Sequence, residues 1–156
     1  ARERIRELIA GRTAVASNAP LLAACGVTDL EGVRAGITDR EELRAACATA
    51  GVGVTGADYA LADTGSLVLM SSASEARMIS LLPPAHIALV SLRRMLTGLD
   101  ELLSVVPDPA EVTSSMLLIT GPSRTADIEQ ILVRGVHGPG EIHVVLLRNT
   151  PEEEEA

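Results

Sequence analysis

Residues 86–92, with the sequence HIALVSL, form a continuous apolar run that fits a β-strand buried on both faces. Such strands are typical of parallel sheets covered by helices. The preceding prolines, Pro83 and Pro84, end a short helix expected at residues 75–81. Other strands are expected at 52–55, 66–71, 115–120 and 142–147, and helices at 2–9, 38–50, 93–105 and 126–133. Strands that alternate with helices predict an α/β domain with a largely parallel sheet.

The composition limits the chemistry of this 156-residue chain, whose length fits one domain. All 13 basic residues are arginine, which excludes lysine Schiff-base chemistry and a Walker-type phosphate loop. Four glutamates at 152–155 supply half of the net charge of −8, and this acidity argues against nucleic acid as a partner. Within the chain we expect an N-terminal helix at 1–12, a linker at 13–37, the main domain at 38–148 and a disordered acidic tail at 149–156.

Cys25 and Cys47 do not form a C-x-x-C pair, and we interpret both as small buried hydrophobes in a reducing cytoplasm. Their spacing with His86, His137 and His143 builds neither a zinc site nor an iron–sulfur cluster, so no bound metal is expected. No apolar run approaches the roughly 20 residues of a membrane span. We therefore expect a soluble cytoplasmic protein whose electron carriers lie on other proteins.

Residues 119–129, ITGPSRTADIE, predict a strand that runs through a turn into a helix. Backbone N–H groups at a helix N-terminus favour an anionic ligand at the carboxyl edge of a sheet. Alternatively, Ser123 and Thr125 only cap the helix. Arg124 is either a bidentate clamp for a carboxylate or phosphate, or a solvated surface residue. The candidate ligand-binding residues here are Thr120, Gly121, Ser123, Arg124, Thr125 and Asp127.

Candidate site residues also lie outside the turn at 120–125. Asp63 precedes the strand at 66–71, Glu129 lies in the expected helix, and His137 lies on the loop before the last strand. These three are the candidate acids or bases, although aspartates of this kind are more often turn residues. We expect His86 and His143 to be structural. The additional ligand-binding candidates are Thr55, Gly56, Thr64, Gly65 and Gly138.

Three blocks of this sequence resemble the LUD-domain family. They are TGADYALADTGSLVL at 55–69, SLLPPAHI at 80–87, and GPSRTADIE at 121–129 followed by GVHGP at 135–139. The resemblance covers residues 40–148. It implies the three-layer α/β fold shared by glucosamine-phosphate deaminase, ribose-phosphate isomerase and CoA transferases (the NagB/RpiA/CoA transferase-like fold), with a largely parallel sheet.

The same resemblance implies a function. Bacterial members of the family are associated with a three-component system that oxidises L-lactate to pyruvate, and its other proteins carry iron–sulfur clusters. We therefore expect a non-redox component without a cofactor of its own, with iron–sulfur partners and a small carboxylate or phosphate ligand. The alternatives are a stand-alone enzyme for acyl-CoA or sugar-phosphate substrates and a structural adaptor. Residues 71–77, SSASEAR, carry serine and alanine where family members often carry glycine, which argues against an anion site there.

Overall fold

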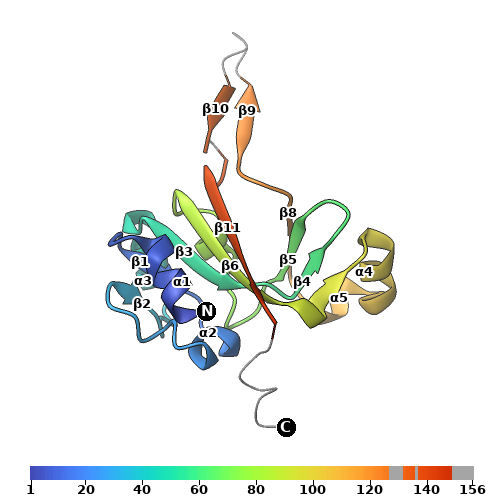
Figure 1. The fold of residues 1–156 in the computed structure, drawn as a ribbon, viewed down its shortest axis with the longest axis horizontal. Helices are drawn as coiled ribbons and strands as arrows, with labels where there is room; N and C mark the ends of the chain where they lie inside the picture. The colour runs from blue at the N-terminus through green and yellow to red at the C-terminus, as the bar shows by residue number, and fades with distance from the viewer. Residues whose placement is uncertain (127–131, 136, 149–156) are drawn as a thin grey trace.

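A five-stranded parallel sheet forms the centre of the molecule (Figure 1). The computed structural model describes residues 1–126, 132–135 and 137–148. Within these residues, the sheet order is β2-β1-β3-β6-β11, and each neighbouring pair is parallel. The strands are β1 (Ala14–Ala16), β2 (Val33–Arg34), β3 (Val52–Gly56), β6 (Ala85–Ser91) and β11 (Glu141–Leu147). The expected α/β class with a largely parallel sheet is confirmed.

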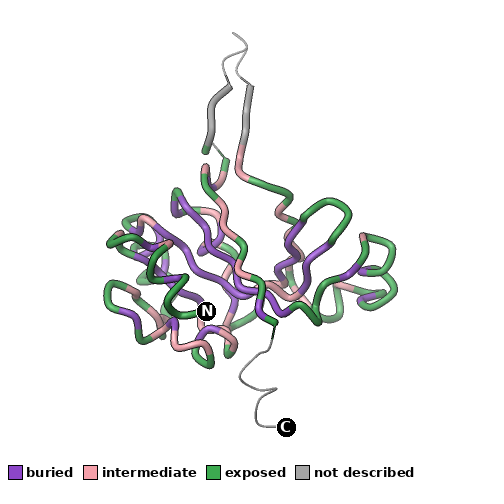
Figure 2. Tube along the Cα trace, in the orientation of Figure 1, coloured by how far each residue is buried: buried purple, intermediate pink, exposed green. Residues whose placement is uncertain are grey.

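Helices cover both faces of this sheet. On one face, α1 (Arg2–Ile9) and α2 (Pro20–Ala24) bury Ile5 and Leu22 in the cluster that contains Ile87. On the other face, α3 (Arg40–Thr49) packs Cys47 beside Val15. Figure 2 shows that burial follows the central strands, and every residue of β3 and β6 is buried. The apolar run is therefore covered on both sides from His86 to Ser91, as its pattern predicts, whereas Leu92 beyond the strand is exposed.

A second, mixed sheet packs against the first and has the order β7-β4-β5-β8. Leu67 and Leu69 face Ala88 and Val90 of β6 between the two sheets. The outer face of the second sheet is covered by α4 (Leu99–Val105), where Leu102 is completely buried. The strands are β4 (Tyr59–Leu61), β5 (Ser66–Met70), β7 (Met95–Leu96) and β8 (Met116–Ile119), and a short helix, α5 (Pro109–Val112), precedes β8.

The helix expected at 126–133 is wrong at its described positions, because Ala126 and residues 132–133 belong to the two strands of an antiparallel hairpin, while residues 127–131 lie outside the described residues. The strands β9 (Arg124–Ala126) and β10 (Leu132–Arg134) pair with each other and project from the body (Figure 1). At the base of the hairpin, the Ser123 N–H donates to the Pro139 carbonyl, and the Gly135 N–H donates to the Ser123 carbonyl. The paired residues are only 6 to 10 positions apart, and pairing between β9 and β10 overrides helix propensity, which is only a weak prior.

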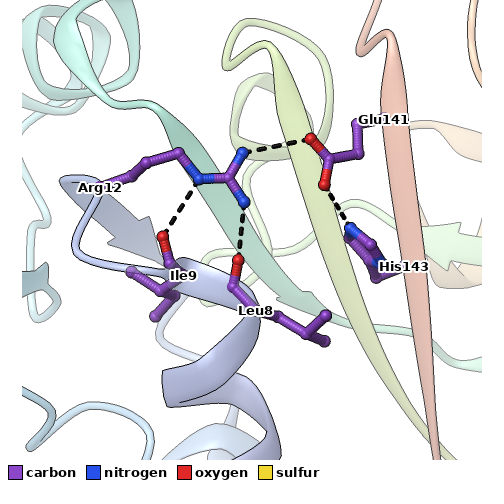
Figure 3. Close-up of polar contacts among 5 residues, drawn as sticks. All are labelled: Leu8, Ile9, Arg12, Glu141 and His143. Atoms are coloured by element: carbon purple, nitrogen blue, oxygen red, sulfur yellow. Dashed lines mark hydrogen bonds and ion pairs between the residues drawn. The ribbon is translucent and has the colours of Figure 1, made fainter.

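The expected linker at 13–37 contains β1, which lies inside the parallel sheet between β2 and β3. Its sequence, Ala14-Val15-Ala16, has little strand propensity, and burial between two strands decides its conformation. Arg12 ties the preceding helix to β11: its guanidinium donates to the carbonyls of Leu8 and Ile9 and pairs with Glu141 at 3.2 Å (Figure 3). The N-terminal residues are thus part of the same core.

Two other helices are shorter than expected. The segment at 75–81 contains only the 3-10 turn η1 (Arg77–Ser80). At 93–105, the turn η2 (Leu92–Arg94) is followed by β7, and the α-helix begins only at Leu99. Pairing of β7 with β4 takes residues 95–96 out of the helical pattern. The turn η2 directly follows the carboxyl end of β6, and η1 packs on β3 at Gly53.

Replacing Asp39 by alanine is expected to destabilise the domain by about 1 kcal/mol. The Asp39 carboxylate accepts the Glu42 N–H at 2.8 Å and so satisfies one of the unpaired donors at the start of α3. Chemical denaturation measures the effect, and Asp39→Asn, which preserves the acceptor, is the matched control. Equal losses in both variants would contradict a capping role.

Candidate functional site

The order of the parallel strands creates a crevice between the carboxyl ends of β1 and β3. From β1 the chain passes through α2 to β2 on one side, and then crosses through α3 to β3 on the other side. Open α/β sheets bind ligands outside the carboxyl ends of the strands at such a point of divergence. Ser17 directly follows β1 and Gly56 ends β3, so both lie at this crevice.

A pocket of about 730 Å³ opens at this edge of the sheet. Residues that end or directly follow the three strands β3, β5 and β6 line it, together with the first residues of α2 and part of η2. Its volume lies in the range typical of small-molecule sites, about 300–1,000 Å³. The polar and charged lining residues are Asp58, Ser71, Ser72, Ser74, Glu75, Ser91, Arg93 and Arg94.

Glu75 joins the ends of β1 and β3 in this pocket. Its side chain is 9% exposed, and its Oε2 atom accepts the Ser17 hydroxyl at 2.9 Å and the Gly56 N–H at 3.3 Å. The other oxygen, Oε1, is buried and has no hydrogen-bond partner within the described part of the chain. Burial raises the pKa of Glu75 to about 7 because desolvation disfavours its charged form. A carboxyl group with this pKa can hold or release a proton near neutral pH.

Positive charge lies across the same pocket. Arg93 and Arg94 line it, and the Arg94 guanidinium lies 5.4 Å from the centre of the Tyr59 ring and donates to the Tyr59 hydroxyl at 3.3 Å. The Asp58 carboxylate accepts the Met70 N–H at 2.6 Å, and burial raises its pKa. Stacking on an aromatic ring orients an arginine and leaves its planar donors available to an oxyanion.

Glu75 also lines a second pocket of about 470 Å³ on the other side of the segment 71–77. Arg40 and Arg77 are the charged residues that line it with Glu75, and hydroxyl side chains make up much of the rest. Ser71, Ser72, Ser74 and Glu75 line both pockets. That this segment lacks an anion site stays a prediction.

Among the predicted site residues, Thr55 and Gly56 lie at this edge of the sheet. Gly56 lines the larger pocket and donates its N–H to Glu75. The Thr55 hydroxyl lies 2.8 Å from Nε2 of His86, and both residues are completely buried. Burial lowers the pKa of His86 to about 4, which keeps the ring neutral. The expectation of a structural His86 agrees with this burial, although its Nδ1 atom has no partner among the described residues.

A second group of predicted residues lies at the other end of β5. Asp63, Thr64 and Gly65 are exposed in the turn before Ser66, whereas the pocket adjoins Met70 at the end of the strand. Hydroxyl contacts of 2.7 and 2.9 Å connect Thr64 through Ser66 to Thr120. The structure thus joins the Thr64 turn to the end of β8, away from Glu75.

A third group lies at the amino edge of the parallel sheet. The His137 N–H donates to the Ser123 hydroxyl at 3.2 Å, and Gly138 lies beside Ser123. The Gly140 N–H donates to the Pro84 carbonyl, and both residues directly precede strands of the sheet. Exposed Gly121 lies between β8 and this group. Arg124 and Thr125 belong to β9, while Asp127 and Glu129 lie outside the described residues. The structure therefore does not gather the predicted residues into one site.

Sequence reasoning missed Glu75, because its neighbours predict the start of a helix.

A glycine pattern also needs the structure for its interpretation. Residues 51–56, GVGVTG, match the glycine spacing of dinucleotide-binding proteins. In those proteins the glycines form the turn after a strand, but here they are largely β3 itself. The signal for the Glu75 site is that Ser17 and Gly56 lie at neighbouring strand ends. This arrangement appears only when β1 and β3 pair.

Neither a metal-ligand cluster nor a membrane-spanning helix is found among the described residues. Within residues 1–126, 132–135 and 137–148, no group of three or more His, Cys, Asp or Glu side chains is arranged to hold a metal ion. None of the helices in these ranges has the length and apolar character needed to cross a membrane.

Fold and pocket define an α/β protein with a pocket of about 730 Å³ at the carboxyl edge of a parallel sheet. The chain belongs to the LUD domain family, whose model matches residues 1–147. This match begins at the first residue, whereas the sequence placed the main domain at 38–148.

Similar proteins include lactate utilization protein C of Halalkalibacterium halodurans, 40% identical over 65% of this chain and 46% of that protein. Another is lactate utilization protein C of Bacillus subtilis, 40% identical over 63% of this chain and 42% of that protein. The chain thus spans less than half the length of these curated relatives. A crystal structure of a DUF162 family protein from Deinococcus radiodurans shares the fold, with a TM-score of 0.66 and 20% identity, over 93% of this chain and 80% of that one.

Proposed function

We propose that this chain takes part in lactate utilization as a non-redox component of a system that oxidises L-lactate to pyruvate. The 40% identity to proteins named lactate utilization protein C carries this proposal. In our proposal, iron–sulfur clusters lie on partner proteins in the cytoplasm, since clusters are commonly held by four cysteines and these 156 residues contain two.

Within that system, the pocket beside Glu75 binds a small carboxylate. Its volume of about 730 Å³ accommodates a small organic acid, and Arg93 and Arg94 provide the positive charge. Arginine suits this purpose because its planar donors match the two oxygens of a carboxylate. This assignment moves the carboxylate site from the predicted loops at 120–127 and 137–138 to the carboxyl edge of the parallel sheet.

Deletion of the gene in its native organism tests the role in lactate utilization. We expect loss of growth on L-lactate with normal growth on glucose, and recovery when the gene is restored. Affinity purification of the restored protein should also recover cluster-containing proteins, identified by their visible absorption and iron content. Unchanged growth on lactate together with no such association would contradict the proposal.

A stand-alone enzyme is the second candidate function. The observation that favours it is Glu75, a buried carboxyl group with a pKa of about 7 in a pocket. This candidate predicts that the purified chain converts an acyl-CoA or a sugar phosphate without any partner protein. The two candidates differ in what they predict. The first predicts that growth on L-lactate depends on the gene, and the second predicts turnover by the purified chain alone.

A further inference from the structure

We propose that two copies of this chain associate edge to edge through β11, paired antiparallel, so that their parallel sheets join into one. Strand β11 ends the sheet, and no strand in the described part of the chain pairs with its outer edge. No residue of β11 lines either pocket at Glu75. The inference therefore does not depend on the proposed ligand or on the role in lactate utilization.

The length of β11 distinguishes it from the other outer strands of the two sheets. β2 and β7 contain two residues each and β8 contains four, whereas β11 contains seven, Glu141–Leu147. Proteins commonly protect an edge strand from pairing by making it short, by placing lysine or proline in it, or by a bulge. β11 contains neither lysine nor proline, and it pairs with β6 in unbroken register over all seven residues. It therefore presents a long, regular edge to a further strand.

One face of β11 is apolar and uncovered. Val144 pairs in register with Ala88 of β6, and their side chains share the face that is turned toward the second sheet. Leu146 pairs with Val90 in the same way. The second sheet covers Ala88 and Val90 completely but does not extend over β11, where Val144 is 45% exposed and Leu146 is 48% exposed. With half-buried Ile142 on the same face, these residues form an open apolar strip.

A second copy fits this edge because β11 is complementary to itself when it is reversed. A twofold axis perpendicular to the sheet keeps each face of the strand on the same side in both copies, as in an isologous interface. Pairing of all seven residues places Val144 on the axis, opposite Val144 of the second copy. Ile142 then lies opposite Leu146, and the two apolar strips become continuous. Aliphatic pairs of this kind across neighbouring strands stabilise a sheet.

The charges at the two ends of the strand favour the same arrangement. Glu141 begins β11, and exposed Arg148 directly follows it. Antiparallel pairing places the acidic end of each strand beside the basic end of the other, whereas parallel pairing would bring the two Glu141 carboxylates together. Glu141 already pairs with Arg12 at 3.2 Å, and in the antiparallel arrangement it lies opposite Leu147. Charge complementarity therefore selects a second, reversed copy as the partner.

Sedimentation equilibrium of the purified chain over a range of concentrations tests this inference. We expect the mass to rise from 16.3 kDa toward twice that value, with a Kd of about 1–100 µM because one strand from each copy forms a small interface. A chain that remains monomeric at about 1 mM would overturn the inference.

Charged variants of Val144 test the position of the axis. Val144→Glu and Val144→Lys should each raise the Kd by about tenfold or more, because two like charges would then meet at the axis. An equimolar mixture of the two variants should dimerise again, because opposite charges meet there. Recovery in the mixture also shows that both variants are folded. Failure of the mixture to dimerise would overturn the antiparallel pairing.

Leu118→Glu is the matched control. Leu118 is 41% exposed and lies on β8, an outer strand of the second sheet. This variant should dimerise as the unmodified chain does. Loss of the dimer in Leu118→Glu, or an unchanged dimer in Val144→Glu, would contradict an interface at β11.

Discussion

Replacing Glu75 by glutamine is expected to stabilise the fold at pH 8 and to have a much smaller effect at pH 5, a difference of about 2 kcal/mol. Burial raises the pKa of Glu75 in the folded protein to about 7 from its ordinary value of 4.5. The folded state therefore binds this proton more tightly than the unfolded state. The resulting stability is complete below about pH 4.5 and is lost as the pH rises through 7. Glutamine remains neutral throughout and avoids the cost of a buried charge.

Urea denaturation of both proteins at pH 5 and pH 8 measures this difference. Titration of His86 contributes equally to the two proteins, so it cancels from the comparison. Glu31→Gln, at an exposed position, is the matched control and should change stability by less than about 0.5 kcal/mol at either pH. If Glu75→Gln had the same effect at both pH values, Glu75 would not be a carboxyl group with a raised pKa.

Replacing Gly53 by alanine is expected to destabilise the domain by about 3 kcal/mol, at the upper end of the cost of overpacking a core. An added Cβ atom at Gly53 would lie 1.9 Å from the carbonyl oxygen of Ile79 in η1, much closer than atoms can approach. The obstacle is backbone, so a change of side-chain rotamer cannot relieve it. The turn η1 must therefore move away from β3.

Gly138→Ala is the matched control, because its added Cβ atom would lie 3.8 Å from Cβ of Ser123, an ordinary contact distance. Chemical denaturation compares the two variants with the unmodified chain. Since Glu75 lies two residues before η1, displacement of the turn should also reduce the difference that Glu75→Gln makes between pH 5 and pH 8. A stability loss below about 0.5 kcal/mol in Gly53→Ala would contradict close packing of η1 on β3.

The sequence alone predicted the elements whose signal is local and strong. Residues 86–91 of the apolar run lie in β6, a strand of the parallel sheet in which every residue is buried, because continuous hydrophobicity is the pattern of a strand covered on both faces. The helix expected at 38–50 is α3, which begins after its cap at Asp39, because a capping residue followed by acids is a local signal of a helix start. The family blocks were also recognisable from sequence, and the LUD domain family is confirmed.

Only the tertiary structure decided the elements that depend on distant partners. The short run Ala14–Ala16 became a strand because β2 and β3 enclose it, and the segment after Ser123 became a hairpin through pairing with residues 132–139. The candidate site has the same origin. Glu75, Ser17 and Gly56 are separated by 19 to 58 positions in the chain, and they meet because β1 and β3 pair in parallel. The pKa of Glu75 then follows from burial, a property of the folded environment that local sequence does not encode.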